Sequence, residues 1–320
     1  MAELNYQEAM HAALSQELAR DARVFAIECR FENAAASAGW QQLAGKTGAA
    51  RARTVSGAAA GAAGAAIGAA LAGLRPVVRF DSPADVFAAA QYLLNVLPAL
   101  RALLQARRQL PLVFIAPTGA GSPWGLLHTA PLEGLFHGAD LVVLAPAGPR
   151  EAYTALLAAV RDDRPVLLLE AAPGGLERQE VSENAEPMPI GTAEFVRVGR
   201  DITLLCWGRN LQAARETADR LEKAGIQSEI LNLRSLQPLD ARAILQSVAK
   251  THRAAVLQDG PSGGGFGAVA VQRIQAEALD ELDGPIEVLS RSDSGMRIGS
   301  VQNDFAAYCA DRITRSVAGI

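Results

Sequence analysis

The sequence predicts an α/β protein built from two units, each with a mostly parallel sheet flanked by helices. Short apolar runs of strand length alternate with longer helical patterns along the 320 residues, of which 50% are hydrophobic. Runs that are apolar throughout are typical of strands covered on both faces. Residues 171–192 interrupt the alternation with glycines, prolines and scattered charge, as a linker does. We therefore expect one domain over residues 1–185 and a second over 186–320.

The elements of the first unit follow from this pattern. Apolar runs predict strands at residues 24–27, 76–80, 111–116, 140–146 and 165–170. Helical patterns fall at residues 84–107 and 149–161. Pro149 opens the second of these helices, where its missing N–H leaves no hydrogen bond unmade.

The second unit repeats the alternation over a shorter length. Apolar runs predict strands at residues 202–208, 228–233, 254–258 and 286–289. Helices are expected at residues 209–224, after Pro238 and from residue 266 onward, and Gly225 is expected to end the first of them. Helices between strands favour a parallel sheet here too.

The charge and cysteine content exclude several classes of function. The net charge of −4 is spread along the chain, and basic residues are not interleaved with aromatic ones, so nucleic acid is not an expected partner. Cys29, Cys206 and Cys309 lie far apart, which predicts neither a metal site nor a disulfide framework. Residues 1–25 are charged and amphipathic, unlike a signal peptide. We expect a cytoplasmic protein.

Residues 55–74, VSGAAAGAAGAAIGAALAGL, contain no charged side chain. Alanine and glycine gain little from hydrocarbon, so we do not expect a membrane span. Four glycines fall on one helical face and cost roughly 1 kcal/mol each relative to alanine, which implies that something approaches that face closely. They are Gly57, Gly61, Gly64 and Gly68. Two explanations are open: a tightly packed core or subunit-interface helix, or a helix that borders a cofactor.

Residues 64–78, GAAIGAALAGLRPVV, resemble the signature of the β subunit of the E1 component of 2-oxo acid dehydrogenase complexes. LHTAPLEGLFHGADLVVLAP (127–146) and ILNLRSLQPLDARAILQSVAKTHRAAVL (230–257) resemble the same subunit, in order and at similar spacing. The resemblance extends to about residue 290. It implies a transketolase-type pyrimidine-binding domain in the first unit and a transketolase C-terminal domain in the second.

The resemblance also implies a cofactor, a partner and a reaction. Members of this family work as α2β2 heterotetramers with thiamine diphosphate (ThDP), whose diphosphate and Mg2+ are held by the α subunit through a GDG…N motif. No such motif occurs in this chain, and DGPSGGGFG (259–267) matches the family's strand-to-helix turn better than a phosphate cradle. The implied substrate is a 2-oxo acid, which is decarboxylated before acyl transfer. A protein bearing a lipoyl group is a further possible partner.

The family's activating glutamate is missing from this chain. That residue begins the glycine helix and protonates the aminopyrimidine of ThDP, but aligning the motif on Ile67 and Gly68 places Ala59 at its position and Ala60 after it. No acidic residue occurs between Glu32 and Asp81, so a small shift of register does not supply one. Slow or unusual ThDP chemistry is therefore expected, if the cofactor binds.

Other implied cofactor-binding residues are Glu28, Gly61 and Phe87, beside Ala59. The family's acidic pair appears here within AIECRFE (26–32), where Glu28 or Glu32 could approach the same space. The family's aromatic segment after the second strand appears as DSPADVF (81–87), in which only Phe87 is aromatic.

His128 matches a family histidine that faces the reaction centre, and it is the candidate acid–base residue. His137 lies near another family histidine and is expected to be structural. Trp124 could line a substrate entrance or cover the core, and the sequence favours neither.

The function that follows is a β-type subunit of a ThDP-dependent 2-oxo acid decarboxylase or dehydrogenase, an oxidoreductase acting with a separate α subunit. Two alternatives are open. One is a non-catalytic structural or regulatory subunit that kept the fold and the assembly surface. The other is a homodimer that binds another ligand in the former cofactor cleft.

Overall fold

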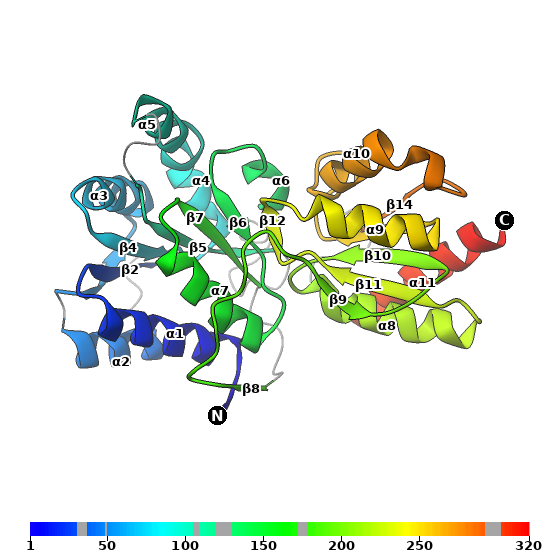
Figure 1. Cartoon of the computed structure of the whole chain (residues 1–320). Helices are drawn as coiled ribbons and strands as arrows, with labels where there is room; N and C mark the ends of the chain where they lie inside the picture. The colour runs from blue at the N-terminus through cyan, green and yellow to red at the C-terminus, as the bar shows by residue number, and fades with distance from the viewer. Residues whose placement is uncertain are drawn as a thin grey trace.

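Two mostly parallel sheets organise the chain in the computed structural model, which describes residues 1–30, 37–48, 50–104, 109–119, 130–171, 178–291 and 302–319. A seven-stranded sheet has the order β12-β6-β7-β5-β4-β2-β3, and a five-stranded sheet has the order β14-β13-β10-β11-β9. Among the described strands of these two sheets, the edge strands β12 and β9 run antiparallel to their neighbours and the others pair in parallel. The predicted α/β class with two units is confirmed (Figure 1).

The helices and strands of the N-terminal part are β1 (Ala2–Leu4), α1 (Tyr6–Arg20), β2 (Val24–Arg30), α2 (Ala38–Thr47), β3 (Ala52–Ser56), α3 (Ala59–Leu71), β4 (Arg75–Arg79), α4 (Pro83–Gln91), the π-helix η1 (Tyr92–Val96), α5 (Leu97–Leu104), β5 (Val113–Thr118), α6 (Glu133–Phe136), β6 (Val142–Leu144), α7 (Pro149–Arg161), β7 (Val166–Ala171) and β8 (Gln179–Val181). Each strand predicted from an apolar run in this part is present. The predicted linker contains β8, which pairs with β1.

The C-terminal part contains β9 (Glu194–Arg197), β10 (Ile202–Cys206), α8 (Asn210–Lys223), β11 (Ser228–Asn232), β12 (Ser235–Gln237), α9 (Ala241–Thr251), β13 (Ala254–Gln258), α10 (Gly267–Glu277), the 3-10 helix η3 (Leu279–Glu281), β14 (Glu287–Ser290) and α11 (Gln302–Ala318). Every residue of β10, β11 and β13 is buried, as in strands covered on both faces, and this includes the polar Glu229 and Asn232 of β11. Gly225 follows α8 with a positive φ of 82°, as expected for a glycine that ends a helix.

The two faces of the seven-stranded sheet are covered by different helices. α1, α2 and α7 cover one face, whereas α3, α4 and α5 lie on the other (Figure 1). Ala26 and Val77 pack under the first group of helices, whereas the next residues along their strands, Ile27 and Val78, pack under the second, because successive side chains of a strand alternate in direction.

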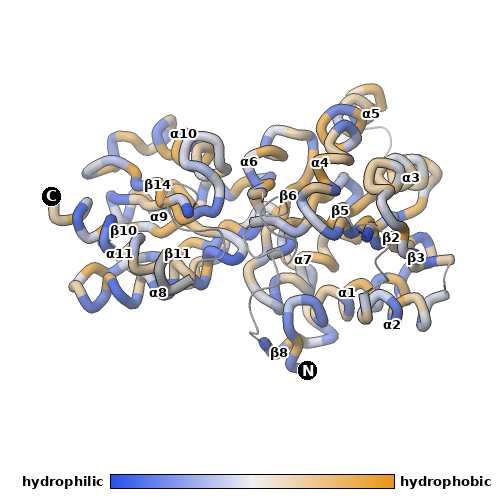
Figure 2. The backbone as a smooth tube through the Cα atoms, turned by 180° about the vertical axis from the view of Figure 1, so that it is seen from behind, coloured by the Kyte–Doolittle hydropathy of each residue, from blue (hydrophilic) through white to orange (hydrophobic). Residues whose placement is uncertain are grey.

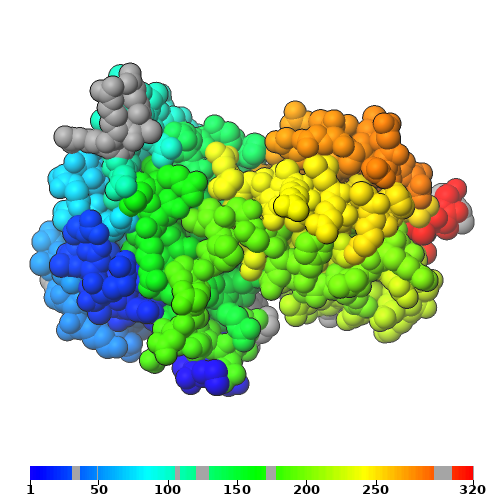
Figure 3. Space-filling view, in the orientation of Figure 1, coloured from blue at the N-terminus to red at the C-terminus, as the bar shows by residue number. Residues whose placement is uncertain are grey.

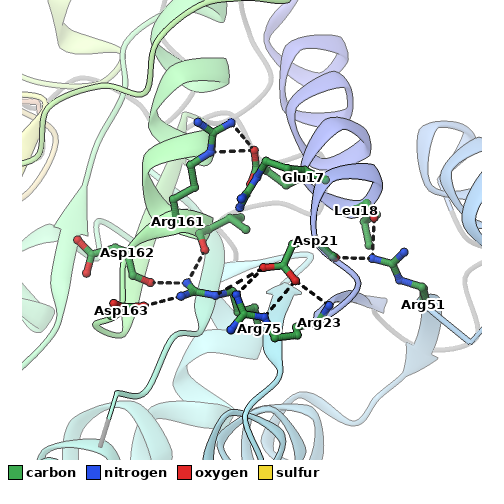
Figure 4. A network of polar contacts seen from close by, with 11 residues as sticks. Glu17, Leu18, Asp21, Arg23, Arg51, Arg75, Arg161, Asp162 and Asp163 are labelled. Atoms are coloured by element: carbon green, nitrogen blue, oxygen red, sulfur yellow. Dashed lines mark hydrogen bonds and ion pairs between the residues drawn. The ribbon is translucent and has the colours of Figure 1, made fainter.

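α1 is tied to α7 and β4 by charged side chains near their ends (Figure 4). Glu17 is fully buried and accepts hydrogen bonds from Arg161 at 2.7 Å and 3.0 Å. Arg75 donates to the backbone carbonyls of Val160 and Asp162 at 2.9 Å and 3.0 Å. These contacts fix the helices that cover the first face.

The two parts of the chain share one apolar core. Phe136 and Leu141 from the first part lie in the same cluster as Trp207, Phe266 and other residues of the second. β12 comes from the C-terminal part but pairs with β6 at the edge of the seven-stranded sheet. The yellow and green surfaces adjoin along this seam in Figure 3. The predicted boundary near residue 185 stays a prediction.

Among the described helices, the continuous stretch Pro83–Leu104 is long and apolar enough to cross a membrane by length and composition alone. It comprises α4, η1 and α5. Val86, Leu93 and Leu97 are fully buried, and they belong to the same core as α3 and β5. Over the apolar window of this stretch, 22% is buried inside the fold.

Candidate functional site

α3 begins at Ala59 without any side-chain cap. The N-cap residue is Ala58, and the first turn contains no acidic residue. Ala59 is buried and packs in the same core as Cys29 of β2, whose thiol pKa is raised to about 12 by burial. A methyl group therefore occupies the position where the resemblance implies a carboxyl group.

The four glycines of the alanine-rich segment have different surroundings. Gly57 precedes α3 and has a positive φ of 60°. Gly61 and Gly68 are exposed, and a Cβ added at either would meet no atom within 4 Å. A Cβ at Gly64 would lie 3.1 Å from Cε1 of Tyr92 in η1. Close approach inside the chain thus explains Gly64, whereas Gly61 and Gly68 leave an open, uncharged face (Figure 2).

Glu28 is fully buried, but on the face of the sheet opposite to Ala59. Its Oε2 accepts hydrogen bonds from Ser37 N and Thr54 Oγ1, each at 3.3 Å. Its Oε1 lies 3.9 Å from Nη1 of Arg79. Glu28 is thus placed among α1, α2 and β3, and the structure does not bring it together with Ala59.

Arg79 joins Glu28 to a second buried acid that sequence reasoning missed. Arg79 Nη2 lies 3.2 Å from Oε2 of Glu170, and Gln7 of α1 donates a hydrogen bond to the same carboxylate. His11 of α1 lies close by, and burial is the main cause of its lowered pKa, with the charge of Arg79 acting in the same direction.

The sequence contains a pattern that predicts this charged cluster. Arg79 and Glu170 each stand at the carboxyl end of an apolar strand, in RPVVR and VLLLEA. Because carboxyl ends of parallel strands meet at one sheet edge, polar residues at such positions gather there. The neighbouring pair of Arg30 and Asp81, 2.8 Å apart, follows the same rule on β2 and after β4.

Phe87 lies on α4 and is 49% exposed, so its ring is available for contact. α4 starts with a capping box in which Asp85 accepts hydrogen bonds from the backbone of Asp81 and Ser82. Burial raises the pKa of Asp85 despite these bonds. α4 packs against α3, which places Phe87 on the same side of the sheet as Ala59.

His128, Glu32 and Trp124 lie outside the described residues. His137 follows α6, and its ring meets Phe266 of the C-terminal part edge-on, with centroids 5.4 Å apart. Burial lowers the pKa of His137. Its position at the seam between the two parts agrees with a structural role.

The glycine-rich loop after β13 is packed too closely to serve as a phosphate cradle. A Cβ at Gly134 of α6 would lie 2.5 Å from the carbonyl oxygen of Gly264, so the two backbones are in direct contact. A Cβ at Gly265 or Gly267 would lie 2.7 Å from the side chain of Gln258. Close packing against α6 at Gly264 and against Gln258 of β13 at Gly265 and Gly267 therefore accounts for these glycines, which lie between β13 and α10 as the predicted strand-to-helix turn requires.

The seam contains a pocket of about 390 Å³ between α4, α6 and the glycine-rich loop. Glu133 of α6 lines it, and burial raises the pKa of this carboxyl group to about 7, with the charge of Asp259 adding to the effect. Phe87 lines the same pocket. Sequence reasoning did not single out Glu133, because one acidic residue in PLEGLF carries no pattern of its own.

ThDP would need ligands for its metal ion, a surface for its aminopyrimidine ring and an acid that activates the ring. No group of three or more potential metal ligands occurs among them. Gly61 and Phe87 offer exposed surface for a ring, but α3 presents a methyl group instead of a carboxyl group, and Glu28 is on the other face of the sheet. The described residues do not supply the activating acid, so no activation step is derived from them.

Comparison with solved structures supports the fold. A split-gene transketolase, solved as an inactive β4 tetramer, superposes with a TM-score of 0.79 at 18% identity and covers 99% of both chains. A transketolase mutant from Pichia stipitis superposes on the whole chain with a TM-score of 0.63, at 15% identity, over 46% of its own length. These likenesses show the fold alone.

Comparison of sequences shows the family. Residues 191–313 match the family described as transketolase, C-terminal domain. The pyruvate dehydrogenase E1 component subunit β of Rickettsia felis is 32% identical over 91% of this chain and 90% of its own. The mitochondrial subunit β-2 of Oryza sativa subsp. japonica is 32% identical over 98% of this chain and 85% of its own. The chain belongs to the family of pyruvate dehydrogenase E1 component β subunits.

Proposed function

We propose that this chain is the β-type subunit of a ThDP-dependent 2-oxo acid dehydrogenase and acts with a separate α subunit. The observation that carries the proposal is similarity to E1 β subunits over nearly the full length of both sequences. The chain also lacks a GDG…N motif. It would therefore provide half of a cofactor site, and the α subunit would hold the diphosphate and Mg2+ in an α2β2 assembly.

The proposed reaction is decarboxylation of a 2-oxo acid followed by transfer of the acyl group, with a lipoyl-bearing protein as a possible acceptor. Bound ThDP would supply the carbanion that attacks the 2-oxo group and stabilise the charge left by decarboxylation. From this chain, Gly61 and Phe87 would contact the aminopyrimidine ring. His128 would exchange protons with the substrate, as a general acid and base.

The first experiment is assembly with a co-expressed E1 α subunit that carries the GDG…N motif. We expect native mass spectrometry of the co-expressed proteins to give an α2β2 mass, and calorimetry to detect Mg2+·ThDP binding only in the complex. The isolated chain should not bind ThDP. Micromolar affinity of the isolated chain for ThDP would contradict the half-site arrangement.

A non-catalytic subunit is the second candidate, and a specific observation favours it. α3 begins with Ala58 and Ala59 and has no acid in its first turn. An assembled complex that binds ThDP but leaves 2-oxo acids intact would support this candidate. A homodimer with another ligand in the cofactor cleft, the third candidate, would give a two-chain mass without α.

We further propose a cytoplasmic location with no nucleic acid or membrane partner. Cys29, Cys206 and Cys309 are all buried free thiols, which fits a reducing compartment. Burial raises the pKa of Cys29 and Cys309 to about 12 and raises that of Cys206 as well, so none is a ready nucleophile. Fractionation of cells expressing the chain would test the location.

A further inference from the structure

The pocket at the seam has aromatic walls and an acidic group. Phe87 of α4, Trp207 after β10 and Phe266 before α10 line it. Trp207 and Phe266 meet edge-on with ring centroids 5.2 Å apart, and both are almost fully buried. Phe87 is 49% exposed at the rim. Glu133 is the acidic residue among the lining residues.

Among the described residues, no basic side chain forms an ion pair with Glu133. Asp259, at the end of the neighbouring strand, acts on Glu133 by repulsion. The two nearby arginines are already engaged, because Arg291 Nε lies 2.9 Å and Arg209 Nε 3.2 Å from the Asp259 carboxylate. Thr118 and Trp207 are the polar side chains that act on Glu133, and neither carries charge. The Trp207 indole N–H has no hydrogen-bond partner among the described residues.

The aromatic rings and the buried carboxyl group of this pocket favour a cationic ligand over an anionic one. Aromatic faces attract cations through their quadrupole, Trp most strongly. A carboxylate in a desolvated position gains most from an ammonium partner, whereas an anion would be repelled by Glu133 and Asp259. His137, the other titratable group on α6, packs edge-on against Phe266 and has its pKa lowered by burial, so it adds no fixed charge.

We infer that the seam pocket is a binding site for a small organic ammonium ion, whose charged nitrogen pairs with Glu133 while its apolar part lies against Phe87, Trp207 and Phe266. The site joins α6 of the first part to the glycine-rich loop of the second. An occupant would therefore contact both parts of the chain and favour the joined arrangement. The inference goes beyond the proposed function, because it requires neither ThDP nor an α subunit.

Benzylammonium is a suitable probe, because it combines one aromatic ring with one ammonium group and stays protonated between pH 6 and pH 8. A fragment of this size is expected to bind the full-length chain with a dissociation constant on the order of millimolar. Only the ionised form of Glu133 pairs with it. With a pKa of about 7 for this group, affinity should rise about tenfold from pH 6 to pH 8.

Calorimetry in phosphate and in HEPES at pH 7 measures the linked proton. About half a proton per probe should be released, since Glu133 is about half protonated there. Benzyl alcohol, the neutral analogue, should bind more weakly and without proton release, and phenylacetate should not bind. These comparisons need no variant.

Two variants and a matched control complete the test. Glu133→Gln should remove both the proton release and the pH dependence, and Phe87→Ala, at the exposed rim, should weaken binding several-fold without unfolding the chain. Glu151→Gln should change nothing, although Glu151 is another buried carboxyl with a pKa raised to about 7 by burial. Absence of benzylammonium binding, equal binding of phenylacetate, or unchanged proton release in Glu133→Gln would overturn the inference. ThDP binding by the α2β2 complex tests the proposed function separately.

Discussion

On one face of the seven-stranded sheet, Glu28, Arg79 and Glu170 lie together under α1, whereas on the other face the same edge carries Cys29 and Ala59. Glu28 and Cys29 are adjacent in sequence, but the alternation of β2 sends their side chains to opposite faces. The first face therefore buries charge in pairs, and the second is apolar near the start of α3.

The two faces differ in whether their buried carboxyl groups have a cation nearby. On the α1 face, two buried carboxylates share one guanidinium, so each charge has an opposite charge nearby. On the α3 face, no described cation pairs with Glu133, and burial together with the charge of Asp259 raises its pKa. The two faces thus differ in whether a cation lies beside the buried acid.

Removing the shared cation should have the largest effect. Arg79→Met leaves Glu28 and Glu170 buried without a partner, and we expect a loss of about 3–5 kcal/mol in the free energy of unfolding. Urea denaturation measures it. Arg200→Met, at an exposed ion pair with Asp201, is the matched control and should change stability by less than about 0.5 kcal/mol. Equal losses in both variants would show that the cluster is not a paired unit.

Replacing Glu133 should raise the free energy of unfolding at pH 8, whereas Arg79→Met should lower it. The folded-state pKa of Glu133 is about 7 against a reference of 4.5, so its protonated form stabilises the fold, and this contribution is lost as pH rises from 4.5 to 7. At 1.36 kcal/mol per unit, Glu133→Gln should be more stable than the parent at pH 8 by up to roughly 3 kcal/mol. The two should converge near pH 4.5. Thermal denaturation at both pH values checks this, and a constant difference would contradict the assigned shift.

The open glycine face of α3 predicts separate effects on the chain and on its assembly. Gly68→Leu removes an exposed glycine from a helix interior and should stabilise the isolated chain by up to about 1 kcal/mol. In the α2β2 complex it should weaken assembly by about 1–3 kcal/mol through overpacking. Gly64→Leu, which faces Tyr92, should instead destabilise the chain itself. Analytical ultracentrifugation measures assembly. Normal assembly of the Gly68→Leu variant would contradict the assignment of this glycine face to a subunit interface.

Restoring the acid on the α3 face should have the most specific effect, because it changes one step of the cofactor's chemistry and not the stability of the fold. In the assembled complex with ThDP bound, Ala59→Glu should speed exchange of the cofactor's C2 proton by roughly tenfold or more, because a positioned general acid contributes about 10²–10⁴-fold. NMR after quenched H/D exchange measures the rate. Ala65→Glu, exposed on the same helix, should leave it unchanged. An unchanged rate in Ala59→Glu would contradict the alignment of α3.

Much of the fold was predictable because strand and helix patterns are local. Helix α7 spans Pro149–Arg161, as its proline and apolar spacing predict, and the buried strands β10, β11 and β13 lie where the apolar runs lie. β12 was not predictable in the same way. It is three residues long and pairs with β6 of the other part of the chain, so its pairing depends on how the two parts meet.

The sequence by itself determined the α/β class, the family resemblance and the absence of an acid at the start of α3, because these depend on residue identity and local spacing. Only the tertiary structure decided which face Glu28 joins, that Gly64 meets Tyr92 while Gly68 stays open, and that Glu133 lies beside Asp259. Those facts depend on contacts between residues far apart in the chain. A protonation state or a close approach is set by such neighbours, and no local pattern specifies them.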